Sequence, residues 1–146
     1  MCAGPPSFDN NRPMSERTQV VSDMYAAFER RDVAAVLRGL DADITLAQTS
    51  VLPWGGTYRG TAGAASFFQK LTTSVETTII AEELIEAGET VVAVARTRGR
   101  VRSNDVRFDV RAVHVWTIRD GKVAAIEFYA DTPAMLAAME QAPTGD

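Results

Sequence analysis

The chain has 146 residues, of which 46% are hydrophobic and 23% charged, which is the ordinary composition of one soluble globular domain. Its net charge of −4 and pI near 5.0 argue against a nucleic-acid-binding protein, because such proteins usually carry a basic excess. The single cysteine, Cys2, rules out an internal disulfide, and the single histidine, His114, leaves few ligands for zinc. We therefore expect no metal and no nucleic-acid partner. Because the sequence also has no nucleotide-binding glycine loop and no nucleophile elbow, we expect no cofactor.

The two ends of the chain differ in composition from the part between them. Residues 1–14 (MCAGPPSFDNNRPM) lack the basic start and apolar stretch of a signal peptide and are expected to form a flexible leader. Residues 142–146 are expected to be a flexible tail, so that 15–141 form a single domain. No apolar run approaches the ~18 residues of a membrane span. The expectation is a cytoplasmic protein without membrane contact.

Helices are predicted in the first half of the chain and at its end. The first starts at a capping residue, Ser15, and a second, short helix starts at Asp32. A third opens at Gly60, and the last begins after Asp131 with a proline in a favoured early position. The first helix carries an apolar stripe at helical spacing, which consists of Val20, Val21, Met24, Tyr25 and Phe28.

Strands are predicted from alternating polar and apolar residues. Residues 43–49 alternate and place Ile44, Leu46 and Gln48 on one face. The segment 50–60 (SVLPWGGTYRG) is rich in turn formers and is predicted to be irregular. Four long strands follow, and the Asp-Gly pair before the last is a strong hairpin signal. Their predicted ranges are 75–86, 90–102, 106–118 and 122–130.

This order of elements predicts an α+β fold, because no βαβ crossover is present. Three helices followed by a meander of strands fit a cone-like, strongly curved antiparallel sheet with the N-terminal helices packed on its concave face. The helices need not fill that face completely, which leaves room for a pocket.

Several motifs in this order resemble a known family. They are FERRDVAAVLRGL, DADITL, PWGGTYRG before the FF helix, VHVWTIRDGKV and FYADTPAML. From Arg17 to Met139 the chain resembles the nuclear transport factor 2-like superfamily, specifically its SnoaL-like, ketosteroid isomerase-related branch. The resemblance implies the cystatin-like α+β barrel of that superfamily. It does not imply one activity, because the fold hosts isomerases, cyclases, epoxide hydrolases, hydroxylases and binding modules.

The resemblance also assigns positions to individual residues. His114 falls where ketosteroid isomerases place a cavity-facing acidic hydrogen-bond donor. Gln48 falls at their proton-moving aspartate and Met24 at their oxyanion-binding tyrosine. The final-strand histidine and carboxylate of SnoaL-like cyclases match Ile126 and Phe128, which are both apolar. No activity of the family therefore carries over residue by residue.

His114 is the candidate catalytic residue. A neutral imidazole donates from one nitrogen and accepts at the other, and an unperturbed pKa of ~6.5 suits general acid–base work. The alternative is a partly buried histidine bonded to a tyrosine or a backbone carbonyl, with no chemistry.

Aromatic and polar residues around His114 are predicted to line the pocket. Trp54 and Tyr58 lie in the irregular segment and could cover a flat apolar ligand, or Trp54 could simply plug the open end of the cone. The predicted ligand-binding residues are Met24, Phe28, Gln48, Trp54, Tyr58, Phe67, Trp116 and Phe128.

Six arginines fall between residues 96 and 111, and four of them share one strand face because they are spaced by two. They could bind a phosphate or nucleic acid. The favoured interpretation is that they pair across the sheet with acidic residues on neighbouring strands. Those acidic residues are Glu82, Glu83, Glu86, Asp105 and Asp109.

Two functions remain open. The first is a cofactor-independent isomerase, cyclase or hydrolase that acts on a small apolar, oxygenated molecule, with His114 as acid or base. The second is a non-catalytic protein that binds such a molecule in the same cavity. A homodimer is expected in either case. The outer face of the 106–118 strand carries a row that includes two valines, which are costly to leave in water, and the resemblance implies pairing through this face. Its residues are Arg111, Val113, Val115 and Thr117.

Overall fold

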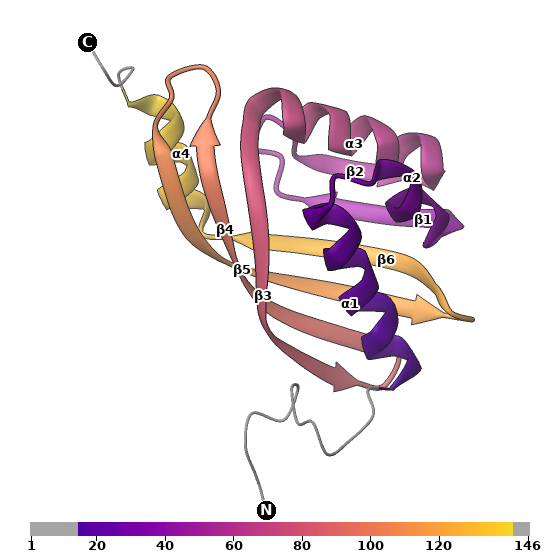
Figure 1. Ribbon diagram of the computed structural model, residues 1–146. Helices are drawn as coiled ribbons and strands as arrows, with labels where there is room; N and C mark the ends of the chain where they lie inside the picture. The colour runs from indigo at the N-terminus through magenta and orange to yellow at the C-terminus, as the bar shows by residue number, and fades with distance from the viewer. Residues whose placement is uncertain (1–14, 142–146) are drawn as a thin grey trace, which may run out of the picture.

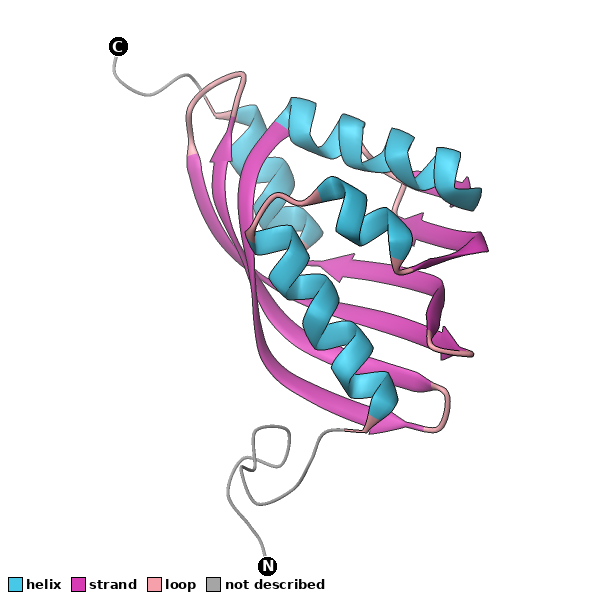
Figure 2. Ribbon diagram, turned by 45° about the vertical axis from the view of Figure 1, so that its right-hand side comes forward, coloured by secondary structure: helices cyan, strands magenta, loops and turns pink. Residues whose placement is uncertain are grey.

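A single curved sheet carries the helices on its inner side (Figures 1 and 2). The computed structural model describes residues 15–141, so the expected leader (1–14) and tail (142–146) lie outside the described residues. In chain order the elements are α1 (Glu16–Glu29), α2 (Val33–Arg38), β1 (Leu40–Gln48), β2 (Gly56–Arg59), α3 (Gly60–Ser74), β3 (Val75–Ala87), β4 (Thr90–Val101), β5 (Arg107–Arg119), β6 (Lys122–Ala130) and α4 (Thr132–Glu140).

The sheet has six strands in the order β2-β1-β6-β5-β4-β3. Neighbouring strands are antiparallel except β1 and β6, which pair in parallel. The two edge strands, β2 and β3, do not pair with each other, so the sheet is curved but open. The predicted α+β fold is confirmed.

The long strands agree with the sequence prediction to within one residue at each end. The first strand starts at Leu40, three residues earlier than expected. The short strand β2 was not predicted, because its four residues lie among turn formers. It forms through pairing with β1, which places Tyr58 opposite Leu46.

The three predicted helix caps are present. The side chains of Ser15, Asp32 and Asp131 accept hydrogen bonds from the backbone N–H groups at the starts of α1, α2 and α4. Each bond satisfies a donor that would otherwise lack a partner in the first helical turn.

Local features of β3 and β4 bend the sheet. The pairing of the two strands shifts register between Ala81 and Glu83, and such bulges increase bending and twist. At Gly99 the two backbones approach so closely that a Cβ would collide with the carbonyl oxygen of Glu76. Glycine is therefore required there. The resulting concave face is the one that the helices cover.

Asn104, in the turn between β4 and β5, holds the C-terminal helix. Its buried side-chain amide donates to the carbonyl oxygens of Ala138, Met139 and Gln141 at 2.8, 3.3 and 3.0 Å. Its Oδ1 accepts from the Val106 N–H at 3.0 Å. One side chain thus joins the hairpin to the end of α4 and satisfies carbonyls that a helix leaves free.

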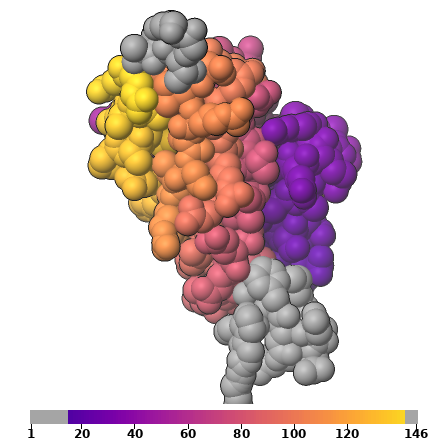
Figure 3. All heavy atoms as spheres, turned by 60° about the vertical axis from the view of Figure 1, so that its left-hand side comes forward, coloured from indigo at the N-terminus to yellow at the C-terminus, as the bar shows by residue number. Residues whose placement is uncertain are grey.

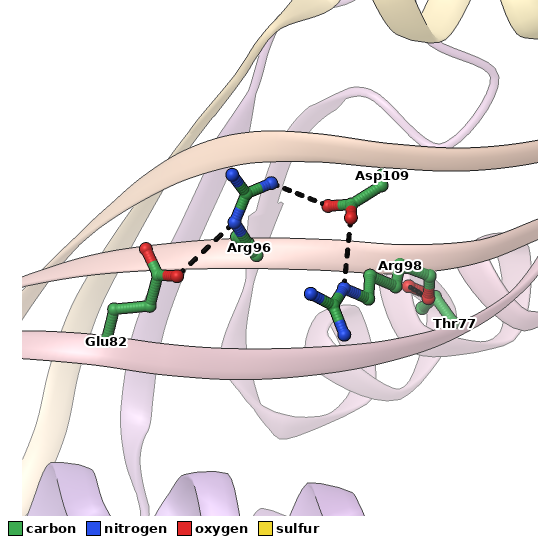
Figure 4. Close-up of polar contacts among 5 residues, drawn as sticks. All are labelled: Thr77, Glu82, Arg96, Arg98 and Asp109. Carbon is green, nitrogen blue, oxygen red and sulfur yellow. Dashed lines mark hydrogen bonds and ion pairs between the residues drawn. The ribbon is translucent and has the colours of Figure 1, made fainter.

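Three arginines of the stripe, Arg96, Arg98 and Arg100, pair with acidic residues on the outer face, as the favoured interpretation predicts (Figure 4). The fourth, Arg102, donates to the carbonyl oxygen of Thr72 at 2.6 Å, and Glu86 pairs with Arg17. Asp109 accepts from Arg96 at 2.8 Å and from Arg98 at 3.0 Å, and Arg96 also lies 3.3 Å from Glu82. Arg100 pairs with Glu76 and Asp105, each at 2.9 Å. Because these side chains are partly exposed, each pair contributes little to stability.

Candidate functional site

A small cavity lies between the inner face of the sheet and the helices. Its volume is about 50 Å³, and most of its walls are apolar. None of the described residues that line it is Asp, Glu, Lys or Arg. The predicted site residues found in this lining are Phe28, Gln48, Trp54, Phe67, His114 and Phe128.

Strand parity places His114 on the inner face of β5. It lies opposite Ala93 on β4 and Phe128 on β6, and it is only 5% exposed. The Phe128 ring meets the imidazole edge-on at a centroid distance of 5.1 Å and stacks on Phe67 at 5.0 Å. The histidine is therefore enclosed by aromatic and small apolar groups.

A tyrosine from α1 reaches this histidine. Tyr25 Oη lies 2.7 Å from His114 Nδ1, and the same oxygen accepts the indole N–H of Trp116 at 3.1 Å. Trp116 is two residues from His114 on the same face of β5 and is fully buried. One phenol oxygen thus joins the helix to two side chains of the sheet.

The donors and acceptors of this cluster fix where the protons lie. An indole nitrogen can only donate, so Tyr25 is the acceptor in its bond to Trp116. Within residues 15–141, the phenol proton then has one acceptor in reach, His114 Nδ1. An Nδ1 that accepts leaves the imidazole proton on Nε2. No hydrogen bond joins this Nε2 to the described residues, and the ring lines the cavity. The imidazole therefore keeps one N–H that has no partner among the described residues, on a ring that forms part of the cavity wall.

Burial keeps both groups neutral. It lowers the pKa of His114 from 6.5 to about 4. Burial also raises the pKa of Tyr25 well above its ordinary value, against a smaller opposite effect of the Trp116 hydrogen bond. Because the unfolded chain, with a histidine pKa near 6.5, binds the proton more readily, the fold loses stability as the pH falls from 6.5 toward 4. Near pH 7 the ring is a neutral hydrogen-bonding group.

Gln48 is a further polar side chain in the lining of the cavity. It lies at the end of β1, opposite Phe128 on β6. Its amide makes no hydrogen bond to any described residue, so both its donor and its acceptor can serve a ligand or a water.

Three predicted ligand-binding residues lie elsewhere. Met24 is buried against Gly39 at the end of α2 and is not part of the lining. The next residue, Tyr25, is the one that faces His114, because one helical step turns a side chain by 100°. Trp116 bonds to Tyr25. Tyr58 donates to the carbonyl oxygens of Trp54 and Gly55, both at 3.0 Å, and thereby fixes the loop that carries Trp54.

Comparison with known proteins identifies the family. The SnoaL-like domain family matches residues 21–126, and the chain belongs to this family. None of the curated proteins matches it.

Solved structures share the fold over nearly the whole described chain. An NTF2-like protein of unknown function from Burkholderia pseudomallei is 29% identical, with a TM-score of 0.82 over 88% of this chain and 100% of its own. An NTF2-like protein from Burkholderia thailandensis is 32% identical, with a TM-score of 0.81 and the same coverage. TerC, co-crystallised with polyporic acid, is 28% identical, with a TM-score of 0.80 over 87% of this chain and 100% of its own.

Two further observations concern the described residues alone. They contain no group of three or more His, Cys, Asp or Glu residues placed to hold a metal ion. No helix in this part of the chain combines the length and the apolar character needed to cross a membrane.

Replacing Tyr25 by Phe tests the hydrogen-bonded cluster. The change leaves the Trp116 N–H and His114 Nδ1 buried without a partner, so we expect the free energy of unfolding to fall by about 1–3 kcal/mol. Urea unfolding measures it. Tyr129→Phe is the matched control, because this tyrosine is 56% exposed and, within residues 15–141, its hydroxyl bonds to Glu127 alone; the change should alter stability by less than ~0.5 kcal/mol. Equal stability of the Tyr25→Phe variant and the unmodified protein would show that the cluster is not formed.

Proposed function

We propose that the protein is an enzyme of the isomerase, cyclase or hydrolase type that acts on a small, apolar, oxygenated molecule in the cavity beside His114. The observation that carries this proposal is the buried His114 in the cavity wall, bonded through Nδ1 to Tyr25, which leaves its Nε2–H without a partner among the described residues. Such a donor, fixed before the ligand arrives, binds a carbonyl or hydroxyl oxygen. It also stabilises negative charge that develops on that oxygen during a reaction.

The apolar lining of the cavity favours a ligand that is mainly hydrocarbon. Phe28, Trp54, Phe67 and Phe128 offer apolar and aromatic surface, and the unpaired amide of Gln48 can orient a second polar group or a water. The relation to TerC supports the same class of ligand, because that protein was co-crystallised with polyporic acid.

The second candidate is a binding protein without turnover. It is favoured by the absence of any carboxylate among the described residues of the lining, and by the low pKa of His114, which makes the ring a weak base. In this case the same Nε2–H would only orient the ligand.

His114→Ala, tested with polyporic acid, examines the proposal. We expect the unmodified protein to bind the compound saturably. The variant should bind at least ~10-fold more weakly, because it lacks the neutral imidazole N–H as a hydrogen-bond donor. Calorimetric titration measures affinity, and mass spectrometry of the incubated compound detects conversion. Lost thermal stability with unchanged affinity would contradict a ligand-contacting role for His114. Conversion by the unmodified protein alone separates the enzyme from the binding protein.

We also propose that the outer face of the sheet forms a homodimer interface. Val92, Val94, Val113 and Val115 lie side by side on β4 and β5 and are only partly buried. Nearby on the same sheet, Ile80, Ile85 and Tyr129 are 38%, 44% and 56% exposed. Figure 3 shows this side of the molecule, with β4 and β5 in salmon and orange. Such an apolar area is suited to a symmetric sheet-to-sheet contact.

The dimer is tested by light scattering at micromolar concentration. We expect the mass of two chains, and we expect Val113→Lys to give the mass of one chain, because it places an unpaired charge in the contact. Arg119→Lys, at the exposed end of the same strand, should remain dimeric. A single-chain mass for the unmodified protein would contradict the proposed interface.

A further inference from the structure

The cavity beside His114 is too small for the molecule that the proposed function requires. A volume of about 50 Å³ holds a few atoms of a ligand, whereas sites for drug-sized molecules occupy ~300 Å³ or more. The remainder of such a molecule must therefore lie outside this cavity.

A second, larger hollow adjoins it. This outer groove, of about 200 Å³, runs between the end of α1, α2, α3 and the start of β3. Figure 2 shows α2 between α1 and α3 on this side of the sheet. The cavity and the groove share five wall residues, which are Phe28, Phe68, Leu71, Thr77 and Ile79.

Two aromatic rings form much of the common wall. Phe28 from α1 and Phe68 from α3 meet edge to face at a centroid distance of 5.1 Å. Phe28 is partly exposed, and rotation of such a side chain needs no change in the backbone. These two rings stand where a ligand would pass from one hollow to the other.

The groove presents a mainly apolar surface to a ligand. The hydroxyls of Thr72 and Thr77 already donate to the backbone carbonyl oxygens of Phe68 and Arg98, at 2.9 and 3.0 Å. Asp32 accepts from the Ala35 N–H as a helix cap. Of the charged residues in its lining, Glu29 and Arg31 remain, and both are exposed where α1 ends.

We propose that the ligand is an elongated molecule with its oxygen-bearing end at His114 Nε2 and its apolar remainder in the outer groove, between Phe28 and Phe68. This rests on the proposed function for the position of the oxygen. The position of the apolar part is argued independently, from the wall that the cavity and the groove share and from the apolar lining of the groove. The two volumes together approach the size of an ordinary small-molecule site.

The experiment uses straight-chain 2-alkanones from 2-hexanone to 2-decanone, which share one ketone oxygen and differ only in chain length. Dissociation constants are measured by NMR titration of the full chain. In the unmodified protein we expect affinity to rise about fourfold for each added methylene, because each is removed from water in the groove. No dependence on chain length, or no binding of any member of the series, would overturn the proposal.

Val33→Trp fills the groove, and Val51→Trp is its matched control. Both valines are exposed, 56% and 59%, so both variants should fold, but only Val33 lines the groove. We expect Val33→Trp to abolish the increase in affinity with 2-alkanone chain length. We expect Val51→Trp to retain that increase. An unchanged gain in Val33→Trp would show that the chain lies elsewhere.

His114→Ala separates this inference from the proposed function. We expect it to weaken binding of every 2-alkanone by a similar factor and to leave the gain with chain length intact. If the gain depends on Val33 but His114→Ala changes no affinity, the groove binds the chain and the proposed role of His114 fails.

Discussion

The site depends on a single phenol oxygen. Tyr25 Oη accepts from Trp116 and donates to His114, and these two bonds link α1 to the middle of the sheet. The phenol proton has no other acceptor among the described residues than His114 Nδ1, so Tyr25 donates to the histidine and the imidazole proton lies on Nε2. The order of donors in this cluster therefore decides whether the cavity contains a hydrogen-bond donor or an acceptor.

The shape of the sheet makes this arrangement possible. The register shift in β3 and the close approach at Gly99 bend the strands, so the helices lie across a concave face that they do not fill. Asn104 holds α4 in place through its hydrogen bond to the Ala138 carbonyl, and Met135 of this helix belongs to the lining of the cavity. A flat sheet would pack against these helices as an ordinary core, and a buried histidine there would have no ligand to meet.

The order of helices and strands was sufficient to predict the α+β fold. Alternation divided each strand into two faces, and the resemblance to the family indicated that the face carrying His114 points into the cavity; His114 and Gln48 both line it. Helical periodicity was less decisive. It put Met24 and Tyr25 on one stripe, but the two residues are adjacent, and only the packing of α1 on the sheet decides which of them meets His114.

The remaining features depend on contacts between distant parts of the chain. Strand β2 needs β1 beside it, and Asn104 looks like an ordinary turn residue until α4 is placed next to it. The cavity and the groove are spaces left between side chains of several elements, and no local pattern in the sequence encodes such a volume.

The most direct test of this account is the protonation state of His114, the only histidine in the chain, observed by ¹⁵N NMR through the imidazole nitrogens. The account predicts a neutral ring with its proton on Nε2 near pH 7, and a pKa of about 4 as the pH is lowered. A proton on Nδ1, or titration at the ordinary value near 6.5, would contradict it.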